Sequence, residues 1–176
     1  TEYGDAAKMI KKIVFMGGSP FGHPDYPDHV SFNLSCDPEA FKIVLDSGIP
    51  LLMIPSDVGR RKAHLDEEFV YRLAEINDVG KLLRDMYIKY WEPGYPNKRV
   101  ATNDTLALFA LLYPKMFTFK KTTVNVCTTC TPGKTFVEFN DVGNVEFITE
   151  INRQAFLDLL ITDLEQMSDI KIDTVK

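Results

Sequence analysis

The chain has 176 residues, of which 45% are hydrophobic and 26% are charged, a composition that indicates a globular core and excludes intrinsic disorder. The formal net charge of −5 argues against nucleic acid and anionic membrane surfaces as partners. No apolar run approaches the roughly 20 residues that cross a bilayer. The three cysteines are too few for a disulfide scaffold and suit a reducing compartment, so we expect a cytoplasmic protein.

A buried strand is predicted near the start of the chain. Residues 13–15 form a continuous apolar run that stops at Met16-Gly17-Gly18. Such a run followed by glycines is typical of a parallel strand that leads into a loop at the carboxyl edge of its sheet. The prolines and aspartates of 19–29 then predict this loop.

The next helix carries signals at both ends. Asp37 suits the N-cap position and Pro38 the first turn, while Gly48 predicts the C-terminal stop. The apolar run 51–54 predicts the second buried strand. The basic cluster at 60–62 is expected to be a solvated face.

The middle of the chain has a helical pattern. Apolar side chains at helical spacing predict one helix from about Asp66 and a second from about Val79. Prolines and a glycine make 91–98 a loop. Asp104 suits the N-cap of a short apolar helix that ends before Pro114.

Strands return in the last third of the chain. Residues 123–127 and 135–139 alternate in polarity like the strands of a hairpin, and 144–149 predict another strand. Asn152 then caps a final amphipathic helix. Together these elements predict an α/β fold in which a largely parallel sheet is flanked by helices and carries a C-terminal β-hairpin. No linker or repeat divides the chain, so 1–176 is expected to be a single domain.

Three segments carry a resemblance to a known family. The first is Met16-Gly17-Gly18 followed by Phe-Asn-Leu-Ser-Cys-Asp-Pro-Glu-Ala at 32–40. The second is Ala-Thr-Asn-Asp-Thr-Leu-Ala at 101–107, and the third is Thr-Pro-Gly-Lys-Thr-Phe-Val at 131–137. In this order and spacing they resemble the C-terminal half of the nucleoside hydrolases, which cleave the N-glycosidic bond of ribonucleosides. The resemblance covers nearly the whole chain but little more than half of a full-length member.

The resemblance implies the chemistry of that family, which serves purine and pyrimidine salvage. Its members hold the ribose rigidly and use a bound Ca²⁺ that contacts two ribose hydroxyls and activates the attacking water. Most of the carboxylates for the ion come from an Asp-rich motif on the family's first strand, and this sequence does not contain that motif. The resemblance therefore implies a hydrolase of which the isolated chain is inactive.

The candidates for the site are Asp104, Asn33 and Met16, together with Asn103, which departs from the family pattern. Asp104 matches the family's Ca²⁺ ligand, which also contacts the ribose, although one carboxylate is an incomplete site for an ion that takes about six to eight oxygens. Asn33 matches a ribose-binding amide, and Met16 matches a methionine that lies against the ribose. By residue type alone these three also suit a helix cap, a loop amide and a core methionine.

Two positions depart from the family pattern. Ser31 stands where the family has a sugar-binding Glu. Asn103 occupies the catalytic position at which many members have a His tied to activation of the leaving group. An amide does not donate a proton as an acid near neutral pH, which argues against protonation of a purine leaving group from Asn103.

Two alternatives stay open. Cys127-x-x-Cys130 has the spacing of half a zinc site or of a redox dithiol. Zinc needs two more ligands, and a redox pair normally opens a helix, whereas this pair lies in a predicted hairpin. The second alternative is a non-catalytic binding or assembly module derived from the hydrolase fold, which Ser31, Asn103 and the absent Asp-rich motif favour.

The expected partners follow from the resemblance and from the predicted sheet. A ribonucleoside is the implied substrate, and neither nucleic acid nor a membrane is expected. An incomplete sheet exposes an apolar edge, so we expect the chain to form a homo-oligomer or to require the missing N-terminal half.

Overall fold

The computed structural model describes residues 4–21, 30–91 and 98–170. Contacts within the chain group it into two compact units, one made of 1–62 with 103–151 and the other of 63–102 with 152–176. The expectation of a single domain over 1–176 stays a prediction.

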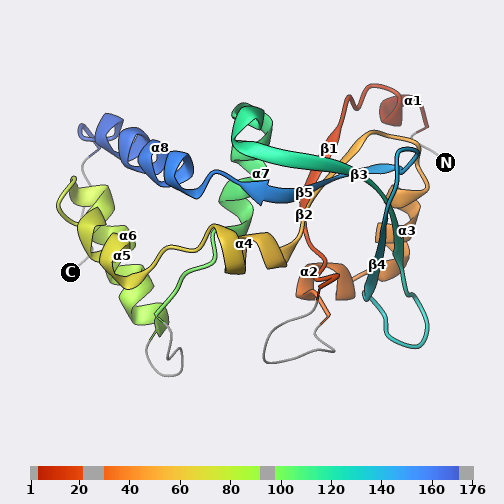
Figure 1. Ribbon diagram of the computed structural model, residues 1–176, viewed down its shortest axis with the longest axis horizontal. Helices are drawn as coiled ribbons and strands as arrows, with labels where there is room; N and C mark the ends of the chain where they lie inside the picture. Colours follow the sequence, from red (N-terminus) through yellow and green to blue (C-terminus); the bar gives the residue numbers. More distant parts are fainter. Residues whose placement is uncertain (1–3, 22–29, 92–97, 171–176) are drawn as a thin grey trace. The chain divides into compact units, whose positions relative to one another are not determined.

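The first unit is built on a five-stranded mixed sheet of order β1-β2-β5-β3-β4 (Figure 1). Its strands are β1 (Ile13–Met16), β2 (Leu51–Ile54), β3 (Phe117–Val126), β4 (Thr135–Phe139) and β5 (Val145–Ile151). The first two and the last are parallel, while β3 runs antiparallel to both β5 and β4. The predicted α/β fold with a C-terminal hairpin is therefore confirmed, with a sheet that is mixed.

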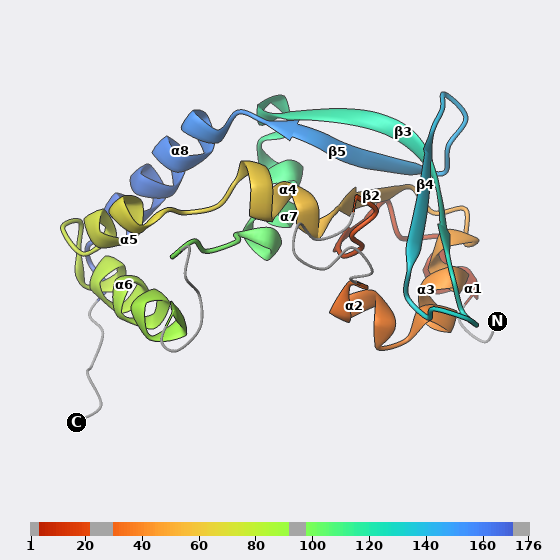
Figure 2. The same cartoon turned by 60° about the horizontal axis from the view of Figure 1, so that its bottom comes forward.

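Strand β3 begins six residues before the predicted hairpin strand, at Phe117 rather than at 123. Its first half pairs with β5, where Phe117 faces Ile151, and a register shift interrupts the ladder after Thr118. Figure 2 shows β3 and β5 side by side along this stretch. The two adjacent lysines of 120–121 break the polar alternation, which is why the pattern did not indicate a strand here.

The core of the first unit lies between the sheet and α3 (Pro38–Leu45). Phe41 and Leu45, one turn apart on α3, belong to one buried cluster with Leu51 and Met53 of β2. Side chains alternate along a strand, so the other two residues of β2 point to the opposite face. Both are buried, and α7 (Asn103–Leu112) contacts β1 and β2. The strand is thus covered on both faces.

The predicted signals of α3 are confirmed. Asp37 accepts a hydrogen bond from the Ala40 N–H at 2.8 Å, and Pro38 occupies the first turn. Gly48 follows the helix with φ +75°, a conformation that favours glycine.

Four short elements of this unit were not predicted. They are α1 (Gly4–Ala7), α2 (Phe32–Ser35), α4 (Ser56–Lys62) and the 3₁₀ helix η1 (Pro114–Met116). The basic cluster of α4 was expected to be a solvated face. Instead, Arg60 pairs with Asp57, and Lys62 pairs with Glu150. The sequence pattern of charges did not show that carboxylates lie close enough to pair with these two cations.

The second unit contains α5 (Glu67–Leu73), α6 (Asp78–Trp91) and α8 (Arg153–Gln166), close to the predicted helices (Figure 2). Asp66 caps α5 by accepting from the Phe69 N–H at 3.0 Å, and Asn152 caps α8 by accepting from the Ala155 N–H at 3.1 Å. The predicted cap of α8 is confirmed. None of the helices in the described part of the chain is long and apolar enough to cross a membrane.

Candidate functional site

The candidate site begins at the carboxyl ends of β1 and β2. Met16 pairs with Ile54 in the parallel register, so the two strands end together. The Gly17 N–H donates to the Ile54 carbonyl at 3.0 Å, and the Ser56 N–H donates to the Gly18 carbonyl at 2.9 Å. These bonds carry the ladder past the strand ends and fix the start of the loop that leaves β1.

Both glycines of this loop are needed for close packing. Gly18 has φ +80°, and a Cβ there would lie 2.2 Å from the Met53 Cε. A Cβ on Gly17 would lie 2.9 Å from Leu34 of α2. The glycines let the loop turn while α2 packs directly against it. This packing accounts for them without any ligand.

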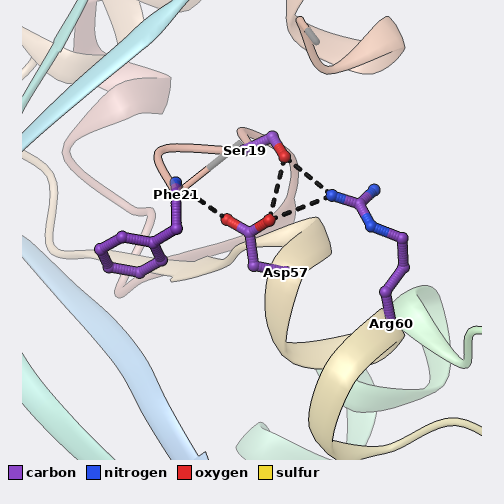
Figure 3. A network of polar contacts seen from close by, with 4 residues as sticks. All are labelled: Ser19, Phe21, Asp57 and Arg60. Atoms are coloured by element: carbon purple, nitrogen blue, oxygen red, sulfur yellow. Dashed lines mark hydrogen bonds and ion pairs between the residues drawn. The ribbon is translucent and has the colours of Figure 1, made fainter. Parts of the chain in front are cut away.

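Asp57, on the first turn of α4, fastens the same loop (Figure 3). Its carboxylate is almost completely buried and accepts hydrogen bonds from the Ser19 hydroxyl at 3.1 Å and the Phe21 N–H at 3.2 Å. The Arg60 guanidinium donates to Asp57 Oδ1 at 3.0 Å and to Ser19 Oγ at 2.8 Å. A buried carboxylate paired in this way is stable because its charge is neutralised and its oxygens are hydrogen-bonded.

Asp57 and Arg60 were not predicted as site residues. The signal was available, because Asp57 comes three residues after a predicted buried strand and therefore lies at the carboxyl edge of the sheet. The basic cluster at 60–62 indicated only a solvated face, and a charge pattern does not show that Arg60 pairs with a buried carboxylate.

Met16 and Asn33 are brought together by the structure. The Asn33 amide donates to the Met16 carbonyl at 3.2 Å, and the same Nδ2 lies 3.2 Å from the Met16 sulfur. Asn33 is exposed on α2, whose preceding residue, Ser31, is buried. One N–H of the amide is thus directed at the end of β1. The roles of both residues in binding ribose stay predictions.

Asp104 does not cap α7, so the predicted N-cap is wrong. The helix begins at Asn103, which places Asp104 inside the first turn, where its side chain is exposed. The pattern of apolar residues could not resolve a shift of one or two residues at a helix end. A carboxylate in the first turn still complements the positive end of the helix dipole.

Asn103 lies against α4. A Cβ on Gly59 would be 1.8 Å from the Asn103 Oδ1, so the Asn103 amide occupies the space that a side chain at 59 would need. The Oδ1 atom is buried and has no hydrogen-bond partner among the described residues. Asn103 therefore contacts the helix that also carries Asp57, but within the described chain no hydrogen bond joins it to Met16 or Asn33.

The described carboxylates do not form a calcium site by themselves. Across 4–21, 30–91 and 98–170, no three His, Cys, Asp or Glu side chains gather where they could hold a metal ion. Asp104 is a single exposed carboxylate, whereas Ca²⁺ takes about six to eight oxygens. The residues present could at most contribute one part of such a site.

Comparison with known proteins agrees with the fold and the motifs. The family model described as inosine-uridine preferring nucleoside hydrolase matches residues 1–158. The non-specific ribonucleoside hydrolase RihC of Salmonella typhi is 32% identical over 126 residues, which are 72% of this chain and 40% of that protein. The chain thus spans well under half of the length of this relative.

Solved structures show the same fold. The purine-preferring ribonucleoside hydrolase from Gardnerella vaginalis superposes with a TM-score of 0.79 at 25% identity, over 96% of this chain and 57% of that one. The inosine-uridine preferring nucleoside hydrolase from Bacillus anthracis gives a TM-score of 0.73 at 22% identity, over 94% and 54%. The family match over most of the chain confirms the resemblance carried by the three motifs. The chain belongs to the inosine-uridine preferring nucleoside hydrolase family.

Proposed function

We propose that this chain forms the ribose-binding part of a nucleoside N-ribohydrolase, in which Met16, Asn33, Asn103 and Asp104 contact the substrate or the metal. The observation that carries the proposal is the bond between the Asn33 amide and the Met16 carbonyl at the carboxyl end of β1. Ligands of α/β folds bind at this edge of the sheet. Family membership supports the same reaction class.

Asn33 is suited to recognise a sugar hydroxyl because its side chain is exposed and held at the carboxyl end of β1. One hydrogen bond to the Met16 carbonyl fixes the orientation of the side chain. The NH₂ group is directed at the Met16 carbonyl and sulfur, so the amide oxygen is the atom that can accept a hydrogen bond from a sugar hydroxyl. Met16, half-buried at the end of its strand, offers an apolar surface beside that amide.

Asp104 is proposed as one ligand of a Ca²⁺ site that the described residues do not complete by themselves. When bound, the ion would supply an activated water and a grip on the ribose hydroxyls. Asn103 precedes this carboxylate, and its amide can hold a polar group but cannot act as the acid that protonates a leaving base. The isolated chain is therefore expected to release no ribose from inosine or uridine, even with millimolar Ca²⁺.

The test uses a longer protein that joins this sequence to the family's Asp-rich first strand. Asn33→Ala removes a polar contact to the sugar, which is expected to cost about 1–3 kcal/mol of transition-state stabilisation. We therefore expect kcat/KM to fall roughly 5- to 150-fold for inosine and uridine alike. The matched control is Asn125→Ala, which removes an exposed amide of β3. Equal kinetics for the two variants would rule out a sugar-binding role for Asn33.

A non-catalytic binding or assembly module is the second candidate, favoured by one observation. The Asn103 Oδ1 is buried against Gly59, so the residue at the catalytic position directs its acceptor into the protein. Calorimetry of the longer protein with ribose and inosine separates the two candidates. Binding without turnover supports the module, and turnover supports the hydrolase.

A further inference from the structure

Two cysteines face each other in the loop that joins β3 to β4. The sulfur atoms of Cys127 and Cys130 lie 3.3 Å apart. Cys127 is half-buried and Cys130 is exposed, so small reagents in solution can reach the pair. The hydrolase function proposed above uses neither of them.

The loop is held in one conformation by its own backbone. The Cys127 N–H donates to the Lys134 carbonyl at 2.9 Å, and the Gly133 N–H donates to the Cys127 carbonyl at 2.8 Å. A third bond, from the Lys134 N–H to the Thr131 carbonyl at 3.0 Å, closes the turn. The approach of the two sulfurs is therefore built into the loop.

Contact with α2 holds the loop from outside. Gly133 has φ +85°, and a Cβ there would lie 2.6 Å from the Ser35 Cα. Only glycine allows the turn to lie this close to the backbone of α2. The turn is thereby fixed at both ends of the dithiol, by the β-hairpin on one side and by a helix on the other.

The turn also stabilises negative charge on Cys127. The Thr131 N–H donates to its sulfur at 3.3 Å, and the Thr129 hydroxyl lies 3.9 Å away. Hydrogen bonds from the backbone of Thr131, then from the backbone of Thr129 and the thiol of Cys130, lower the pKa of Cys127 from its ordinary value to about 6. At neutral pH Cys127 is therefore mainly a thiolate, the reactive form of cysteine.

We propose that Cys127 and Cys130 are a peroxide-sensitive dithiol, in which Cys127 is the nucleophile and Cys130 the resolving thiol of a reversible disulfide. The proposal stands on the sulfur contact and the fixed turn, and it is independent of the hydrolase function. A hairpin supplies here, through turn N–H groups, the stabilisation that redox pairs usually obtain from a helix N-terminus.

The reaction takes two steps. The Cys127 thiolate attacks one oxygen of hydrogen peroxide and breaks the O–O bond, which gives a sulfenic acid on Cys127 and releases hydroxide that becomes water. Cys130 then attacks the sulfenic sulfur, the S–S bond forms, and the sulfenic oxygen leaves as water. In sum two thiols lose two electrons, and one peroxide becomes two waters. The sulfurs must approach from 3.3 Å to about 2 Å, which small rotations of the side chains allow.

Mass spectrometry after brief exposure to hydrogen peroxide tests the proposal. Trypsin is expected to cut after Lys121 and Lys134, so both cysteines fall in the peptide 122–134 and Cys36 falls in another. We expect this peptide to lose about 2 Da, the mass of two hydrogens, and to regain it with dithiothreitol. Cys130→Ser should leave a sulfenic acid on Cys127 that dimedone traps, whereas Cys127→Ser should abolish the fast reaction.

Cys36→Ser is the control, because this exposed cysteine lies outside the pair and its loss should change nothing. The alkylation rate of Cys127 with iodoacetamide should rise as pH increases through about 6 and exceed that of Cys36 at pH 7. Alkylation of Cys36 as fast as Cys127, peroxide products without an internal disulfide, or zinc bound by both thiols in the purified protein would each overturn the proposal.

Discussion

Gly59 and Asn103 show how closely single residues fit at the candidate site. A methyl group on Gly59 would overlap the Asn103 Oδ1 at 1.8 Å, and this oxygen is already buried with no hydrogen-bond partner among the described residues. The nearest backbone atom, the Asn103 Cα, lies 3.4 Å from the same position, which is ordinary contact. The restriction on Gly59 therefore comes from the amide and not from the fold of α7.

This difference predicts strong coupling between the two residues. Gly59→Ala alone should lower the free energy of unfolding, because the Asn103 amide has to move. In an Asn103→Ala background the same change should raise stability by about 0.5–1 kcal/mol, because alanine is the better helix former and the space is free. Urea denaturation of the four proteins of the cycle measures the coupling. Effects that simply add would show that the amide does not fill the space beside Gly59.

The sequence predicted some residues of the site better than others. Met16 and Asn33 were each found through one family motif, and the structure adds that their side chains are in contact. Asp57 and Arg60 belong to none of the three family motifs. Their pairing depends on the short helix α4, for which no N-cap was predicted from the sequence. The two residues are three apart, a spacing that lets them pair on a helix, but the burial of Asp57 depends on the tertiary fold and is not visible in residue types.

Among the elements, the helices with polar caps were predicted closely. Asp37 and Asn152 each accept from a backbone N–H three residues later, a local interaction that the sequence shows directly. The short helices α2 and α4 carry no such signal. The first half of β3 was missed because its pairing with β5 is long-range and its lysines break the alternation.

Asp66 links two elements of the second unit and gives a prediction on pH. Its carboxylate accepts from the Phe69 N–H at 3.0 Å and from Arg153 of α8 at 2.9 Å. The hydrogen bond from Phe69 first, and Arg153 after it, hold the pKa of Asp66 below its ordinary value of 3.8. The stabilisation is therefore present above the unfolded-state pKa and is lost as the pH falls through the lower folded-state pKa.

Asp66→Ala should lower the free energy of unfolding at neutral pH by about 1 kcal/mol, the usual value of a helix cap, since the partly exposed ion pair with Arg153 adds little. Asp66→Asn keeps the cap acceptor and should recover most of this loss while flattening the acid dependence below pH 4. Denaturation with urea at pH 7 and pH 2.5, with Glu68→Ala as an exposed control on α5, measures both. An unchanged acid dependence in Asp66→Asn would contradict the assignment.

At the scale of the whole molecule, an open edge of the sheet and exposed apolar side chains favour association. Within the described residues β1 is paired on one side only, with β2. Three leucines of α7, Leu108, Leu111 and Leu112, are each more than half exposed. Unpaired strand edges and exposed apolar groups favour association.

We therefore expect the isolated chain to self-associate with rising concentration, as measured by sedimentation velocity. Leu111→Glu places a charge among the exposed leucines and should weaken the association, whereas Glu39→Gln on exposed α3 surface should not. A monodisperse monomer at high protein concentration would count against an open edge that needs a partner.

We propose that the Asn103-Asp104 segment serves the reaction in a complete hydrolase. Steady-state kinetics of two variants test this role most directly. In the longer protein described above, Asp104→Ala should reduce kcat/KM for inosine and uridine by at least about 100-fold, because loss of one metal ligand weakens both the ion and the hold on the ribose. Asn103→Ala should cost little, because the amide is not an acid. Near-normal kcat/KM in Asp104→Ala together with loss of activity in Asn103→Ala would contradict the claim.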